Sequence, residues 1–195
     1  MHRQDLWPTP LWYFEVPSAL INPDDIVQDA YTHQKLDNGV IYSNIGGYQS
    51  SGLTMEDHVP PTLTKLLEII VKQCQTCSAE LGFERTLGIA NYWININKKN
   101  QYNRMHVHSG CILSGSYYAA TPPKSGGIVF HNGPEASYIL DGLVLMGAKN
   151  TRFTSTLQAV EPKAGAVLIF PSWQQHSVEE NRSDEDRISI AFNLA

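Results

Sequence analysis

The 195-residue chain has 42% apolar and 17% charged residues and a formal net charge of −5 at pH 7. This composition is typical of a globular protein long enough to bury one core, so we expect a single domain over residues 1–195. The negative net charge gives no strong indication of nucleic-acid binding. No run of about 18 apolar residues and no apolar leader is present, so we expect a cytoplasmic protein without a membrane partner. A homodimer is left open.

The first half of the chain predicts one strand and two helices. An aromatic and β-branched run at 11–16 is typical of a strand. Asn-Pro-Asp-Asp at 22–25 begins a helix, since Asn caps it and the acids face the positive end of its dipole. Asp-Asn-Gly at 37–39 ends that helix, and a second one runs over about 60–82. The polar, glycine-rich segment 43–52 is expected to be a loop, either a lid over the substrate or a plain connection.

Two cysteines in the second predicted helix have a spacing that invites a redox or zinc interpretation. Cys74 and Cys77 form a C-x-x-C pair. Apolar residues recur at helical intervals from Leu63 to Leu81, which places both cysteines on the apolar face of the helix. Because no second C-x-x-C is present, we expect buried core cysteines.

After residue 86 the sequence changes to short apolar or β-branched runs separated by turn residues. We expect eight strands, near residues 89–96, 104–108, 112–120, 128–130, 154–160, 167–170, 175–178 and 188–193. Segments rich in Pro, Gly and Asn separate several of them. This order predicts a mainly β (α+β) fold, a double-stranded β-helix or jelly roll, with the two N-terminal helices packed outside.

Three histidines are spaced in a way that indicates a metal site. His106 and His108 are two positions apart, so both project to the same face of a predicted strand, and His176 follows an apolar strand-like run. Ligands converging from one side are typical of non-haem iron oxygenases, usually two histidines and a carboxylate. No acid lies between Glu84 and Glu135. The site therefore has either three histidines or two with an open position.

An arginine in the last predicted strand indicates an anion receptor beside that site. Arg187 lies eleven positions after His176, in a strictly alternating run. Arg187 and Ser189 point to one face of the strand, and the apolar residues point to the other. The planar fork of arginine suits a carboxylate. An ion pair with the acidic turn 183–186 is the alternative, but the alternation turns the arginine away from that turn's last residue.

The order of these motifs resembles that of the Fe(II)/2-oxoglutarate-dependent oxygenases, and within them a group of short proteins from marine bacteria and phages. The segments that carry the resemblance span most of the chain: Gly46–Ser50, Met105–His108, Leu113–Tyr118, Phe170–Trp173 with His176, and Arg187–Ser189 with Asn193. The superfamily usually has Asp or Glu where this chain has His108.

The resemblance implies a double-stranded β-helix with Fe(II) on the catalytic residues His106, His108 and His176. It also implies that Arg187 and Ser189 bind the co-substrate 2-oxoglutarate. The implied reaction is an oxidation, in which a substrate is hydroxylated while 2-oxoglutarate is converted to succinate and CO2.

The first strand after residue 86 has an amide-rich face. Asn91, Trp93, Asn95 and Asn97 share that face by the period of two. They either line the pocket or form a solvated edge strand. Asn95 is our candidate for an additional 2-oxoglutarate contact.

Two other classes of protein are compatible with parts of this pattern. A cupin-type enzyme, such as a thiol dioxygenase or an isomerase, would use three histidines and no 2-oxoglutarate, but Arg187 and Ser189 argue against it. A non-catalytic jelly-roll binding module would not need clustered histidines. The substrate is left open among a metabolite, a nucleotide and a protein side chain.

Overall fold

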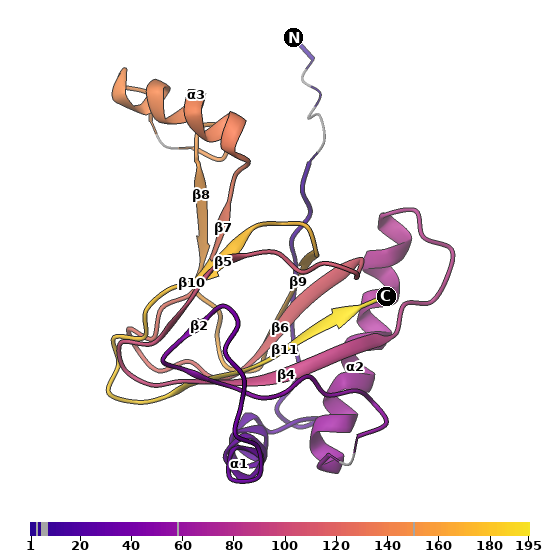
Figure 1. Cartoon of the computed structure of the whole chain (residues 1–195). Coiled ribbons are helices and arrows are strands. Elements are labelled where there is room, and N and C mark those ends of the chain that lie inside the picture. Colours follow the sequence, from indigo (N-terminus) through magenta and orange to yellow (C-terminus); the bar gives the residue numbers. More distant parts are fainter. Residues whose placement is uncertain (3, 5–7, 58, 150) are drawn as a thin grey trace.

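A computed structural model of the chain describes residues 1–195 except 3, 5–7, 58 and 150. The described part is mostly β-sheet with few helices (Figure 1). The helices are α1 (Pro23–Gln34), α2 (Pro61–Glu80) and α3 (Pro134–Leu145). The strands are β1 (Trp12–Glu15), β2 (Asn44–Ile45), β3 (Tyr48–Gln49), β4 (Ile89–Asn97), β5 (Tyr102–His106), β6 (Leu113–Ala120), β7 (Ile128–His131), β8 (Leu157–Val160), β9 (Ala166–Pro171), β10 (His176–Val178) and β11 (Arg187–Leu194). No helix in the described residues is long and apolar enough to cross a membrane.

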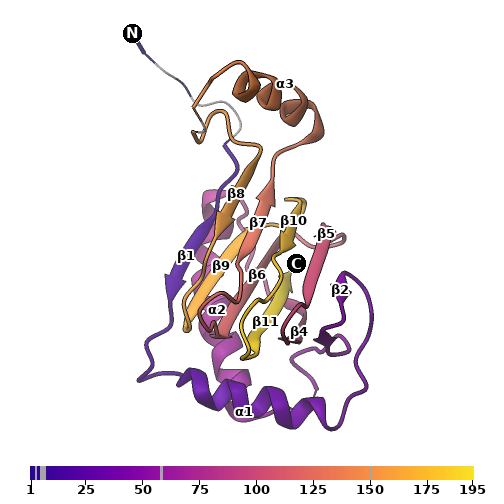
Figure 2. The ribbon, with the colours of Figure 1, turned by 90° about the vertical axis from the view of Figure 1, so that its left-hand side faces the viewer.

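The strands form two antiparallel sheets that lie face to face (Figure 2). The larger sheet has the order β1-β9-β6-β11-β4-β3, and the smaller has the order β2-β5-β10-β7-β8. Strand β11 is central in the larger sheet, between β4 and β6. The side chains on the inner faces of the two sheets are therefore the ones that can meet.

The main core lies between the larger sheet and the helices α1 and α2. Ile188, Ile190 and Phe192 of β11 are at most 1% exposed and belong to the same apolar cluster as Ile26 and Leu67 of the helices. At about 25 cal/mol per Å² of apolar surface, burial of this kind is the main term that stabilises the sheet. The alternate residues of β11 are thereby left on the inner face, as the alternation predicts.

The prediction of core cysteines is confirmed. Cys74 and Cys77 are free thiols that are 0% and 5% exposed on the core side of α2. Burial raises the pKa of the Cys77 thiol to about 11. A protonated, buried thiol is a poor nucleophile and a poor metal ligand, which argues against a redox or zinc role.

The loop predicted at 43–52 is wrong in part, because it contains β2 and β3. Strand β2 pairs with β5 of the smaller sheet, and β3 pairs with β4 of the larger sheet. Each has only two residues, too short for a periodic pattern to be visible in a glycine-rich sequence. The segment therefore links the two sheets at one end.

Helix α3 was not predicted. It lies between β7 and β8 and projects away from the two sheets (Figure 1). Its sequence begins with Pro134 at the first helical position, which is compatible with a helix start. From the sequence alone, Asn-Gly-Pro at 132–134 indicates only a turn between two strands.

Candidate functional site

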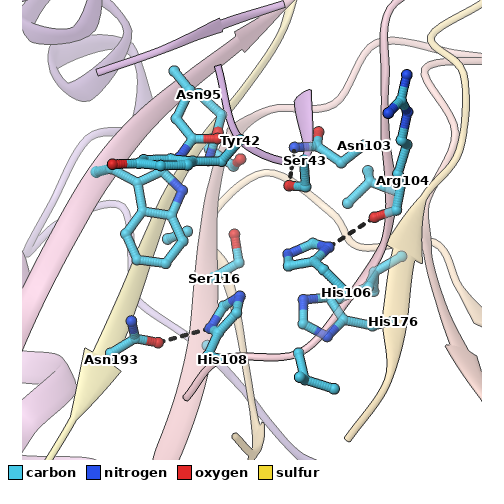
Figure 3. Close-up of a pocket in the computed structure, with 18 of the residues that line it drawn as sticks. Tyr42, Ser43, Asn95, Asn103, Arg104, His106, His108, Ser116, His176 and Asn193 are labelled. Atoms are coloured by element: carbon cyan, nitrogen blue, oxygen red, sulfur yellow. Dashed lines mark hydrogen bonds between the residues drawn. The ribbon is translucent and has the colours of Figure 1, made fainter. Parts of the chain in front are cut away.

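Three histidine side chains converge between the two sheets. His106 ends β5, His176 begins β10, and the two residues are directly opposite in the ladder. His108 follows β5 and is not in the strand, contrary to the prediction, because β5 ends at His106; its N–H donates to the backbone oxygen of Ser172 (3.0 Å). One ring nitrogen from each histidine nevertheless lies within 4.8 Å of the others (Figure 3). The sequence spacing therefore correctly predicts that the three histidines lie close together. Their proximity does not come from His106 and His108 sharing one strand.

Local hydrogen bonds fix the orientation of two of these rings. His106 Nδ1 lies 2.7 Å from the backbone oxygen of Arg104, and His176 Nδ1 lies 2.9 Å from that of Gln174. Because a carbonyl only accepts, each Nδ1 carries the proton. Each Nε2 is then left with its lone pair, which is the form that binds a metal.

The third ring is held by side chains. His108 Nδ1 lies 2.7 Å from Asn193 Oδ1 and 2.8 Å from Ser114 Oγ. Trp93 packs edge-on against the imidazole, with ring centroids 5.4 Å apart. In all three imidazoles Nδ1 is thus engaged, and Nε2 has no hydrogen-bond partner among the described residues.

The electrostatic environment favours neutral imidazoles. Burial, and the neighbouring His106, lower the pKa of His108 to about 4 and that of His176 to about 3. Burial also lowers the pKa of His106. Neutral imidazole is the form that ligates a metal, so no proton has to leave at neutral pH. Three neutral nitrogens from one side fit Fe(II) and leave its other positions open.

A cavity of about 640 Å³ adjoins the histidines. Asn91, Trp93, Asn95 and Asn97 all line it. Strand β4 is paired on both sides, by β3 and β11, so it is not an edge strand. The prediction of a cavity wall is confirmed, and the alternative of a solvated edge strand is wrong. Arg104 is the one charged residue, apart from the histidines, among the described residues that line it.

Arg187 of β11 lies opposite Asn97 of β4 and is 1% exposed. Its Nη1 donates to the backbone oxygens of Ser125 and Glu179, the latter at 2.9 Å. Its Nη2 is buried and has no hydrogen-bond partner among the described residues. Arg187 itself is not a lining residue, whereas Ser189 does line the cavity. The backbone carbonyls, and not the acidic turn at 183–186, are its hydrogen-bond partners.

Several lining residues are given no role in the site by the sequence pattern, although most of them lie in segments that carry the resemblance. They include Gln49, Asn103, Ser116, Tyr118 and Asn193. The inward direction of Asn193 follows from the sequence, because it continues the alternation of Arg187 and Ser189 on β11. The others come from strands whose register decides which side chains face inward, and single-sequence periodicity does not give register.

Several solved structures have the same fold as this chain, and they include prolyl hydroxylases. A Pseudomonas putida prolyl-4-hydroxylase has a TM-score of 0.65 at 13% identity, over 94% of this chain and 91% of that chain. A prolyl hydroxylase from Trichoplax adhaerens, in complex with a hypoxia inducible factor peptide, has a TM-score of 0.65 at 12% identity, over 94% and 82%. HygX from Streptomyces hygroscopicus, with nickel and 2-oxoglutarate bound, has a TM-score of 0.58 at 12% identity, over 96% and 83%. At these identities the likeness shows the fold, which is the jelly roll of 2-oxoglutarate oxygenases.

The fold and the histidine cluster thus define a non-haem metalloenzyme of the jelly-roll class. The model of the family described as "Putative 2OG-Fe(II) oxygenase" matches residues 91–193, more than half of the chain. The chain belongs to this family, and Fe(II) and 2-oxoglutarate are its cofactor and co-substrate. No curated protein matches the sequence. Membership excludes the cupin-type enzyme without 2-oxoglutarate and the non-catalytic module.

Proposed function

We propose that this chain, as a single domain over residues 1–195, is a dioxygenase that hydroxylates a small molecule or a side chain. In this proposal His106, His108 and His176 hold Fe(II), while Arg187, Ser189 and Asn95 hold 2-oxoglutarate. Iron with 2-oxoglutarate and O2 would supply the oxidising chemistry: one oxygen atom goes to the hydroxylated substrate and the other to succinate, and CO2 is released. A cytoplasmic location and a homodimer stay predictions.

The convergence of three neutral imidazoles is the observation that carries the proposal. Their ligand atoms lie within 4.8 Å of one another, and their pKa values are all lowered. Burying His176 fully and His106 and His108 partly, without a ligand, has a desolvation cost and no evident structural benefit. Preformed, neutral and hydrogen-bonded rings are what a metal site requires.

The end of the cavity near Arg187 supports the assignment of the co-substrate. Ser189 lies directly opposite Asn95 in the β4–β11 ladder, and both line the cavity. Arg187 lies opposite Asn97, and both have a buried nitrogen without a hydrogen-bond partner in the described structure. Buried donors are seldom left unpaired. A carboxylate at this end would accept from them, and a guanidinium is a suitable partner for it.

Other residues of the chain shape the cavity between the histidine cluster and the end near Arg187. Phe170 packs against His176 with ring centroids 4.8 Å apart and closes the cavity on the side of β9. Ser43 and Gln49, which belong to the segment 43–52, also line the cavity, and so does Tyr42 just before it; Tyr42 and Ser43 are labelled in Figure 3. This position supports the interpretation of the segment 43–52 as a lid over the substrate.

The test is substrate-stimulated succinate formation. Protein loaded anaerobically with Fe(II) and 2-oxoglutarate would be exposed to air with a panel of amino acids, nucleotides and peptides. Prolyl peptides belong in the panel because two of the similar structures are prolyl hydroxylases. We expect succinate to form in proportion to hydroxylated product, and His176→Ala to form none. Absence of both metal binding and 2-oxoglutarate binding in the parent would contradict the proposal.

A further inference from the structure

Three polar side chains lie in a row across the larger sheet, next to His108. Asn193 of β11 is directly opposite Asn91 of β4 on one side and Ser114 of β6 on the other. Asn193 Nδ2 donates to Asn91 Oδ1 (2.8 Å), and Ser114 Oγ donates to Asn193 Oδ1 (2.7 Å). Ser114 is 0% exposed. The row is therefore a continuous hydrogen-bonded connection that ends at the imidazole.

The direction of these hydrogen bonds determines the tautomer of His108. Because the amide nitrogen of Asn193 is engaged by Asn91, its oxygen faces His108 and Ser114. An amide oxygen only accepts, so the proton on the 2.7 Å contact must come from His108 Nδ1. The Nε2 of His108 then keeps its lone pair. Without Asn91, the amide of Asn193 could turn over and present its nitrogen to the ring.

His108 depends on this row more than the other two histidines depend on side chains. The Nδ1 atoms of His106 and His176 contact backbone oxygens of residues two positions earlier in their own segments. His108 lies beyond the end of β5, and its Nδ1 contacts come from side chains of β6 and β11. A ring outside a strand has more rotational freedom unless such contacts restrict it.

We propose that Asn193, oriented by Asn91 and Ser114, is a positioning residue that fixes the tautomer and the direction of the His108 ring. This inference rests on the proposed function, in which His108 is a metal ligand. Hydrogen-bond partners of ligating histidines typically contribute about 10- to 100-fold to metal affinity. The row would supply this contribution to metal affinity through His108, the proposed ligand at the position where the superfamily usually has a carboxylate.

The experiment titrates metal-free protein with Co(II), which is stable in air, and records affinity and the visible d–d spectrum. Asn193→Leu keeps the approximate volume and removes both hydrogen bonds, so we expect about tenfold weaker binding and a changed spectrum. Asn193→Asp keeps an acceptor for His108 and should bind at least as tightly as the parent. If Asn193 only filled space, Asn193→Asp would not bind Co(II) more tightly than Asn193→Leu.

A double-mutant cycle separates positioning from a general structural effect. In a His108→Ala background the row has no ligand to position, so Asn193→Leu should then change Co(II) affinity by less than about twofold. Equal losses in the two backgrounds would overturn the inference, as would parent-like binding and spectrum for Asn193→Leu. If Asn193→Leu does not fold, as judged by circular dichroism, Asn91→Ala takes its place in the cycle, with a smaller loss expected and parent-like binding overturning the inference.

The same data distinguish this inference from the proposed function. A parent that does not bind Co(II) contradicts the metal site itself, and the positioning role with it. Parent-like binding by His108→Ala contradicts His108 as a ligand. Weakening by His108→Ala together with no effect of Asn193→Leu contradicts only the role of Asn193.

Discussion

His176 lies directly opposite His106 across the β5–β10 ladder, with ring centroids 4.3 Å apart. The two residues are 70 positions apart in the chain, yet antiparallel pairing makes them neighbours on the same face of the smaller sheet. Cross-strand neighbours of this kind are among the most closely fixed pairs in a sheet. A metal held by both would therefore bind to a site that exists before the metal arrives.

Removing either of these histidines should abolish stable metal binding. His106→Ala and His176→Ala each delete one of only three proposed protein ligands, so we expect most of the Fe(II) to be lost. Metal analysis of the purified variants, loaded anaerobically, measures the loss. His131→Ala is the matched control, since His131 bonds Ser177 and is not in the cluster. Near-full occupancy in either cluster variant would show that the metal binds elsewhere.

Arg187→Met should leave the metal bound and abolish 2-oxoglutarate binding. Deleting one partner of a buried charge pair costs about 3–5 kcal/mol, or at least about a hundredfold in affinity. Ser189→Ala should cost about 1–3 kcal/mol, for one hydrogen bond to a charged group. Calorimetric titration of the metal-loaded variants with 2-oxoglutarate compares the two. Binding by Arg187→Met within a few-fold of the parent would place the receptor elsewhere.

Substitutions of His108 test whether the third imidazole is a ligand. His108→Ala should weaken Fe(II) binding at least tenfold, or about 1.4 kcal/mol. His108→Asp would restore the ligand set that is usual in the superfamily, so we expect it to bind Fe(II) and to keep some succinate formation. Parent-like metal affinity in His108→Ala would instead indicate a site with two histidines and an open position.

The metal-free protein should lose stability as the pH is lowered from about 6.5, the usual histidine pKa. The pKa of His108 is lowered to about 4 and that of His176 to about 3 in the folded protein. Below pH 6.5 the unfolded chain therefore binds protons that the folded chain does not, and this favours unfolding. For each such histidine, the free energy of unfolding falls by at most about 1.4 kcal/mol per pH unit. The fall ends when the pH reaches the pKa of that histidine in the folded protein.

Urea unfolding of the metal-free protein between about pH 7 and 5 measures this dependence. His176→Gln removes one of the groups with a lowered pKa and should show a shallower dependence than the parent. The same slope in both proteins would mean that His176 is not held neutral in the folded state. Added metal should stabilise the folded protein by a similar amount at both ends of this range, because His108 and His176 are already neutral there.

Gly115→Ala should destabilise the fold without changing any functional group. A Cβ at this position of β6 would lie 2.3 Å from the Phe192 ring and 2.4 Å from the backbone oxygen of Leu168. The oxygen belongs to the neighbouring strand β9 and cannot move away cheaply, so we expect a loss of about 1–3 kcal/mol. Thermal unfolding checks this, with Gly88→Ala as control, since Gly88 is outside the helices and a Cβ there meets nothing within 4 Å beyond its chain neighbours. A melting temperature of Gly115→Ala equal to that of the parent would contradict the tight packing of β6 against β9.

The sequence predicted the strands and the inward-facing residues where the pattern was long and strictly periodic. In β11 the apolar residues had to face the helices, so Arg187, Ser189 and Asn193 were left on the other face. In β4 the same period placed Asn91, Asn95 and Asn97 together. Burial of one face of a strand determines the direction of every side chain along it, and this information is local in the chain.

Only the tertiary structure decided what those faces meet. The pairing of β5 with β10 brings His106 to His176, and the contact of His108 with Ser172 carries the third imidazole beyond the strand that was expected to hold it. The row from Asn91 through Asn193 to Ser114 depends on the register of three strands that are distant in sequence. Register is set by packing over the whole sheet and not by any one segment, which is why the candidates could be named from the sequence but their hydrogen bonds could not.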